Sequence, residues 1–156
     1  MRGYAGKGLY DVPPMLGCRL FNSANQSIPA GTFAALTFNS ETYDFGGLHS
    51  TAALTSRITF PRSGWVIAGG TVDWSAPAAT IVEAFALLRN AAETLSAQTQ
   101  LDINTGGFQM SISTGFRVVA GDYIELYVQH SNAVAIDSVA GGASNIPNFW
   151  ATLWPD

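Results

Sequence analysis

Short runs of β-forming residues, separated by clusters of glycine, proline, asparagine and serine, recur along the chain from residue 18 onward. Many short strands at this spacing are typical of a β-sandwich or β-barrel. The runs that we read as strands are CRLFN, FAALTFN, SRITF, GWVIAGGTVDW, FQMSIST, FRVVA, DYIELYVQH, AVAIDSV and NFWATLW. The clusters that we read as turns include SETYDFGG, PRSG, NTGG and AGGASNIP.

The clearest alternation lies in AGDYIELYVQH, residues 120–130. Ile124, Leu126 and Val128 recur at every second position, which predicts a strand with one face in a core. The residues of the opposite face are Tyr123, Glu125, Tyr127 and Gln129. This face is expected to be solvent-exposed, but it contains two tyrosines. The question is therefore what these two side chains contact.

Charged residues make up only 12% of the 156 residues, about half the usual fraction. Two explanations stay open from composition alone. In the first, copies of the chain pack together, so that part of the surface is buried and needs no charges. In the second, the surface is solvated by serine, threonine and asparagine side chains in place of charged ones.

The charge pattern argues against several classes of protein. The net charge is −4 and Lys7 is the only lysine, so we expect no nucleic-acid binding, which needs a basic patch. The apolar runs fall far short of the ~20 residues that span a membrane, and we expect no secretory signal, because no basic segment precedes an apolar run at the start. The single cysteine, Cys18, excludes an internal disulfide and reads as a small buried hydrophobe.

Residues 78–97 support two interpretations. Their apolar positions follow a four-three-four-three spacing: Ile81, Phe85, Leu88, Ala92 and Leu95. This periodicity favours an amphipathic helix. The alternative is a hairpin with its turn near Asn90 and Ala91.

The first 17 residues differ from the rest. Four glycines and the Pro13-Pro14 pair argue against a regular element. We expect an extended arm over residues 1–17 that anchors a single domain over residues 18–156. The side chains expected to serve as anchors are Tyr4, Leu9, Tyr10, Val12 and Met15.

The order of several motifs points to a family. CRLFNSANQSIPAGTFAALTFNSETYDFGGLHS contains a Q-x-I-P step and a YD-x-x-G-x-H loop, and SRITFPRSGWVIAGGTV places Trp65 where an aromatic residue is expected. LLRNAAETLS follows an L-x-x-N-G hairpin with Ala91 at the glycine, AGDYIELYV is a Gly-Asp strand, and NFWATLW a closing strand. Over residues 18–154 the chain thus resembles the complement globular-head and tumour-necrosis-factor-like jelly rolls, in particular their short bacteriophage members.

The resemblance implies an all-β jelly-roll sandwich that assembles as a homotrimer, and it turns residues 78–97 into two strands. It places one face of the Gly-Asp strand at the threefold axis, where Tyr123 and Tyr127 meet their symmetry mates. Trp150 and Trp154 either share this trimer interface or belong to the sandwich core. Glu125 then needs a partner, for which Arg57 and Arg117 are the candidates.

No residue pattern indicates catalysis. His49 and His130 are far apart in sequence, and no nucleophile elbow accompanies them. We expect a structural turn role for His49, and a solvent or subunit contact for His130. Glu41 and Asp44 read as turn residues rather than a glycosidase pair. We expect no metal, because no spacing selects acids that loops could offer to calcium, such as Asp102, Asp122 or Asp137, and we expect no cofactor.

These observations lead to two functional expectations. The first is a non-enzymatic trimeric protein of a virus particle surface, such as a bacteriophage capsid decoration protein, head fibre or spike, held by its arm to the major capsid protein or another virion protein. The alternative is the receptor- or carbohydrate-binding head of a phage tail or fibre protein, with a host surface glycan as ligand. Its candidate loops are 41–50, 75–80, 104–107 and 131–145, and its candidate stacking residues are Tyr43, Phe45 and Trp74.

Overall fold

The computed structural model describes residues 14–75, 81–102, 109–140 and 147–156. Within these ranges the chain consists of strands and connecting turns, without a helix. The strands are β1 (Leu16–Phe21), β2 (Gln26–Ile28), β3 (Ala34–Ala35), β4 (Ser40–Phe45), β5 (Arg57–Thr59), β6 (Gly64–Asp73), β7 (Ile81–Arg89), β8 (Glu93–Asp102), β9 (Gln109–Val118), β10 (Tyr123–His130), β11 (Ile136–Ser138) and β12 (Asn148–Pro155). The expected all-β architecture is confirmed.

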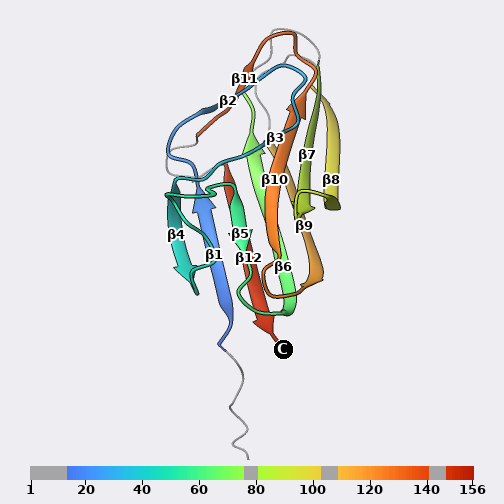
Figure 1. Cartoon of the computed structure of the whole chain (residues 1–156). Coiled ribbons are helices and arrows are strands. Elements are labelled where there is room, and N and C mark those ends of the chain that lie inside the picture. The colour runs from blue at the N-terminus through green and yellow to red at the C-terminus, as the bar shows by residue number, and fades with distance from the viewer. Residues whose placement is uncertain (1–13, 76–80, 103–108, 141–146) are drawn as a thin grey trace, which may run out of the picture.

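Two five-stranded antiparallel sheets lie face to face as a sandwich (Figure 1). Sheet I has the order β4-β1-β12-β6-β9. In sheet II the order is β3-β10-β7-β8, and β5 also pairs with β10. A short ladder of β2 and β11 adds a third, two-stranded sheet. The first strand pairs with the last, Leu16 opposite Leu153, so the chain enters and leaves the domain in neighbouring strands.

The core fills the space between the two sheets. The three apolar residues of the Gly-Asp strand, Ile124, Leu126 and Val128, are fully buried, which confirms the face predicted from their alternation. Cys18 is buried as well, and burial raises the pKa of its thiol well above the usual value. A buried thiol that stays protonated behaves as a small apolar side chain, as expected.

Residues 81–102 form a hairpin, so the helical interpretation is wrong. Strand β7 pairs with β8 on one side and with β10 on the other, and it buries Phe85 and Leu87 completely. Asn90 and Ala91 both have positive φ angles, and the Ala92 N–H donates to the Arg89 carbonyl. These are the features of a type I′ turn.

Two local expectations need correction. The cluster SETYDFGG was expected to be a turn, but residues 40–45 form β4, the edge strand that pairs with β1. Only its end turns, where the Asp44 carboxylate accepts bonds from the Leu48 and His49 N–H groups. Of FAALTFN only Ala34–Ala35 is a strand, because this segment crosses from one sheet to the other and pairs briefly with β10.

Candidate interaction surface

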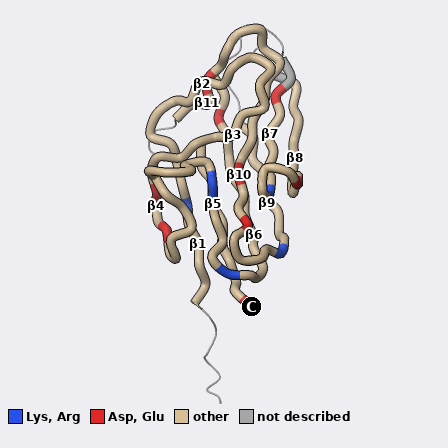
Figure 2. Tube along the Cα trace, viewed as in Figure 1, with Lys and Arg blue, Asp and Glu red and all other residues tan. Residues whose placement is uncertain are grey.

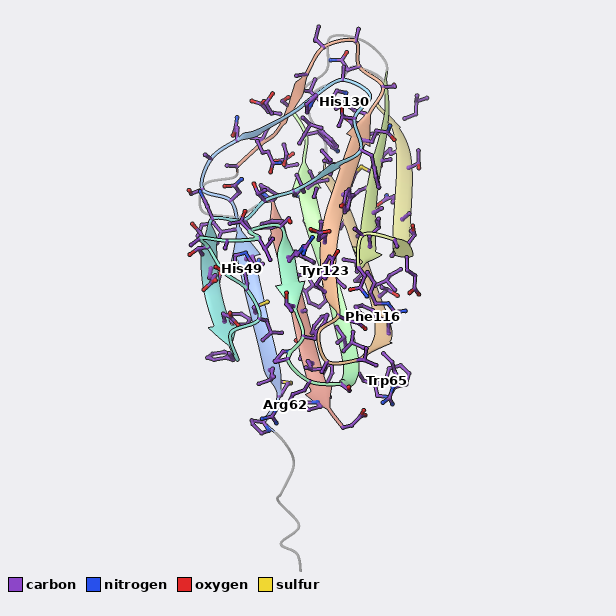
Figure 3. All side chains as sticks on the ribbon, viewed as in Figure 1. His49, Arg62, Trp65, Phe116, Tyr123 and His130 are labelled. Carbon is purple, nitrogen blue, oxygen red and sulfur yellow. The ribbon has the colours of Figure 1, made fainter. Side chains whose placement is uncertain are left out.

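Large apolar side chains gather on the outer face of sheet I, which faces away from the core. We call Met15, Phe45, Trp65, Ile67 and Trp154 the apolar patch. Each is between 43% and 67% exposed. Figure 3 shows Trp65 projecting away from the strands. Soluble monomers rarely expose a contiguous surface of this kind, which usually marks an interaction site.

Strand alternation explains why these side chains point outward together. On β6 the buried Val66 and Ala68 alternate with the exposed Trp65 and Ile67. Trp154 lies directly opposite Trp65 on the neighbouring β12. Since successive side chains of a strand point to opposite faces, the residues that fill the core commit their neighbours to the surface.

The other members come from the edge of the sheet. Phe45 on β4 lies opposite Gly17 of β1 and stacks on Tyr43, with ring centroids 5.3 Å apart. Met15 immediately precedes β1, in phase with the outward-facing Gly17 and Arg19. No charged side chain belongs to the patch, although Arg117 lies at its border with its guanidinium 5.5 Å from the Trp65 ring centroid.

Beside the patch, farther along the same strands, lies a more polar depression that we call the Arg19 hollow. It has a volume of about 400 Å³ and is lined by Arg19, Tyr43, Thr71, Asn148 and Trp150. Arg19 stands between Tyr43 and Trp150 in the strand register. The Trp150 ring leans over β6 at Gly69, where even a Cβ atom would lie 2.9 Å from the ring.

The second face of β10 is partly covered by side chains of its own chain. Tyr127 stacks on Phe33, with ring centroids 4.8 Å apart, and Tyr123 lies under the Arg57 guanidinium at 3.9 Å. Glu125 is 3% exposed and accepts bonds from Ser56, Arg57 and Tyr127.

This cluster answers the question about the partner of Glu125. Arg57 is that partner, whereas Arg117 pairs with Asp156. Burial, followed by the charge of Glu125, raises the pKa of Tyr127 and keeps its hydroxyl protonated as a donor. Both tyrosines remain half-buried.

The four residues predicted for the trimer interface fall on two different sheets. Tyr123 and Tyr127 lie on the outer face of sheet II, and Trp150 and Trp154 on the outer face of sheet I. Within one chain they do not meet. The two tyrosines and the two tryptophans can share one interface only if sheet II of one copy contacts sheet I of the next. The alternative placement of the two tryptophans in the sandwich core is wrong, because Phe149, Ala151 and Leu153 take that side of β12.

The predicted ligand residues are separated too. Tyr43 and Phe45 lie side by side on β4, exposed as a ligand contact requires. Trp74 is corrected: it is 1% exposed and packs edge-on against His130 in the interior, so it is not available to a sugar. Of the predicted loops, residues 76–80 and 104–107 and most of 140–145 lie outside the described residues.

Both histidines have structural surroundings. The His49 ring is buried and bonds to the Glu41 carboxylate and the Thr55 carbonyl, as its predicted turn role requires. His130, expected at solvent or a subunit contact, is 1% exposed. Its Nε2 lies 2.9 Å from the Ile28 carbonyl, and its Nδ1 accepts from the Asn132 N–H. Both nitrogens of this imidazole are therefore used for hydrogen bonds within the core.

Among the described residues, no group of three histidine, cysteine or acidic side chains could hold a metal. No helix there is long and apolar enough to cross a membrane. Of the predicted arm anchors, Met15 is described and exposed, whereas Tyr4, Leu9, Tyr10 and Val12 lie outside the described residues.

Comparison with known proteins identifies the fold. No protein-family model and no curated protein sequence matches the chain. Solved structures of murine APRIL do match: the one at pH 5.0 has a TM-score of 0.65 at 13% identity, and the one at pH 8.5 a TM-score of 0.61 at 15% identity. Both alignments cover 90% of this chain and 99% of the other. The chain therefore has a jelly-roll fold like that of the tumour-necrosis-factor family, as its motifs predicted.

The sequence contains a signal for the interaction surface. The family motif explains Trp65 as an aromatic position, and Ile67 belongs to an apolar run. Their alternation with Val66 and Ala68 already places them on the face opposite the core. The sequence gives no comparable signal for Arg19, because a lone arginine in a strand carries no pattern.

Proposed function

We propose that this chain is a non-enzymatic structural protein that works as a homotrimer on the surface of a virus particle. A bacteriophage capsid decoration protein, head fibre or spike fits this description best. The observation behind the trimer is the apolar patch of sheet I. A second copy of the same chain is a partner that is always present and could cover this patch. The viral setting rests on the resemblance of the motifs to short bacteriophage jelly rolls.

The energetics favour self-association. Fully burying a large apolar side chain contributes roughly 1.5–3 kcal/mol. The five residues of the patch are about half exposed, so covering them contributes on the order of 5 kcal/mol for each copy, before the entropy of association is subtracted. Figure 2 shows how thinly charges are spread over the chain, which leaves little repulsion to overcome.

The patch replaces part of the trimer interface expected from the sequence. Trp154 stays in it and Trp150 borders it, whereas Tyr123 and Tyr127 already have partners within their own chain. A head-to-tail trimer joins unlike surfaces of neighbouring copies. Sheet II of one copy can therefore still contribute at the rim of the patch of the next.

Light scattering on a sizing column tests the trimer. The chain mass is 16.5 kDa, so a trimer has 3 × 16.5 = 49.5 kDa. Ile67→Arg places a charge in the centre of the patch and should yield folded protein of 16.5 kDa. The control is Val134→Arg, an exposed apolar position outside both large sheets, which should remain trimeric. A wild-type monomer at micromolar concentration overturns the proposal.

Attachment to the particle is assigned to residues 1–17. Three arms on one trimer bind with an avidity far beyond that of a single weak contact. Deleting residues 1–13, which leaves Met15 of the apolar patch in place, should leave a folded trimer that no longer joins particles. Retained incorporation of the truncated protein contradicts the anchoring role without touching the trimer.

A second function is favoured by the stacked rings of Tyr43 and Phe45. Exposed aromatic pairs offer flat faces to sugar rings, and binding sites of this kind occur on many jelly rolls. In this role the protein is the receptor- or carbohydrate-binding head of a tail or fibre. Specific adsorption of purified protein to host cells supports it, whereas binding to empty capsids alone supports decoration.

A further inference from the structure

The Arg19 hollow contains an arginine without a partner. Among the described residues, the Arg19 side chain takes part in no hydrogen bond and no ion pair, although its Nε atom is buried. By contrast, Arg57, Arg89 and Arg117 each pair with a carboxylate. A buried donor that has left water without gaining a bond destabilises the free protein. A ligand that accepts from this donor removes that cost.

The remaining lining groups define the ligand further. Asn148 is nearly buried, and none of the hydrogen bonds within the described residues uses its side chain. The Thr71 hydroxyl lies beside it, 3.1 Å from that of Ser111. Tyr43 and Trp150 flank the guanidinium on the two neighbouring strands. The hollow thus combines one cation, one amide, hydroxyls and two aromatic side chains.

We propose that the Arg19 hollow binds an acidic sugar residue, such as a hexuronate of a surface polysaccharide. A guanidinium binds a carboxylate through two parallel bonds. Aromatic rings pack against the C–H face of a pyranose, and Asn148 and Thr71 can bond its hydroxyls. A simple carboxylic acid would use only Arg19, and a neutral sugar would leave it unpaired. This inference rests on the second proposed function and names its ligand class.

The hollow and the apolar patch are lined by different residues of the same sheet. The residues of the hollow lie farther along β1, β6 and β12 than the patch, toward the end of the sheet where Asn148 begins β12. The hollow and the apolar patch are therefore neighbours on one sheet that share no lining residue, and the stacked rings of Tyr43 and Phe45 join them. Their tests can be separated.

The test is calorimetric titration of the full chain with trigalacturonate, with its uncharged methyl ester as the matched ligand. Wild-type protein should bind the acid at least ~10-fold more tightly than the ester, because charged hydrogen bonds are lost with the ester. Arg19→Gln should remove that preference, whereas Arg19→Lys should keep part of it. The control variant Arg62→Gln, at an exposed position, should bind like the wild type.

Three outcomes overturn the proposal. If the wild-type protein does not bind trigalacturonate, the Arg19 hollow is not an acidic-sugar site. Equal binding of acid and ester shows that the aromatic rings alone recognise saccharides, which preserves the second function but not the acidic ligand. An unfolded or dissociated Arg19→Gln, seen by circular dichroism and light scattering while Arg19→Lys remains trimeric, shows that the carboxylate belongs to a second copy of the chain.

Discussion

Asp122 and Asn90 are far apart in sequence but are joined by a side-chain hydrogen bond of 2.8 Å. The second Asp122 carboxylate oxygen accepts from the Val119 N–H, and the side-chain Oδ1 of Asn90 accepts from the Tyr123 N–H. The Asn of the hairpin motif and the Asp of the Gly-Asp motif therefore connect the β7–β8 turn to the turn that precedes β10. This contact gives a physical reason why the two motifs occur in one chain.

Asp122→Ala tests how much this connection between the two turns contributes to stability. Burial by itself raises the pKa of the Asp122 carboxyl, but the bonds from Asn90 and Val119 and the charge of Arg89 outweigh it and hold the pKa below the usual value. A lowered pKa means stabilisation that is full above pH ~4 and is lost as the pH falls through the folded-state pKa. The variant should lose about 1–2 kcal/mol at pH 7.

The measurement is urea unfolding of both proteins between pH 7 and pH 2.5. The difference between wild type and Asp122→Ala should shrink toward acid. A difference that does not change with pH would show that the variant loses packing and not a charged acceptor.

Among the secondary-structure elements, the β7–β8 hairpin shows that local hydrophobic periodicity can predict the wrong structure. The four-three spacing of its apolar residues is that of a helix, but pairing with β10 and β8 satisfies the backbone on both sides of β7 and buries Phe85 and Leu87. Tertiary pairing therefore overrides helix propensity. Only the motif around Asn90 pointed to the turn before the structure did.

The same turn contains a residue in an unfavourable conformation. Ala91 has a φ of 55°, in the left-handed region that glycine adopts freely, and glycine is also what the motif expects there. Ala91→Gly should therefore stabilise the protein by about 1 kcal/mol, since relief of the left-handed strain outweighs the extra flexibility of the unfolded chain. Chemical denaturation measures the change. Ala92→Gly, beyond the left-handed pair, is the control and should not stabilise; a gain there equal to that at Ala91 would contradict the strain argument.

Strand alternation predicted which side of each strand is buried, but it could not predict which strands share a sheet. Ile124, Leu126 and Val128 were assigned to the core correctly from their period alone. The tyrosines of β10 and the tryptophans of β12 were expected in one interface, yet their strands belong to opposite sheets. Sheet membership follows from pairing between segments distant in sequence, which no local pattern records. For the same reason Arg57 and Arg117 could both be named for Glu125, but not ranked.

At the scale of the whole molecule, the two outer faces of the sandwich differ. On sheet II, Tyr123, Tyr127 and Glu125 are tied to Phe33 and Arg57 of the same chain. On sheet I, the apolar patch has no such cover among the described residues. A sandwich with one outer face partly covered by its own side chains and a second face that exposes a cluster of large apolar residues is suited to assembly through the second face.

Association through the patch should make the thermal stability depend on protein concentration. Anything that binds only the folded state stabilises it by mass action, and here the ligand is the chain itself. Raising the concentration 100-fold should raise the Tm of the wild type by ~5 °C. Ile67→Arg should melt at one temperature throughout the range, because it folds as a monomer, while Val134→Arg should follow the wild type. Scanning fluorimetry measures all three, and a wild-type Tm that is independent of concentration would mean that the patch stays exposed to water.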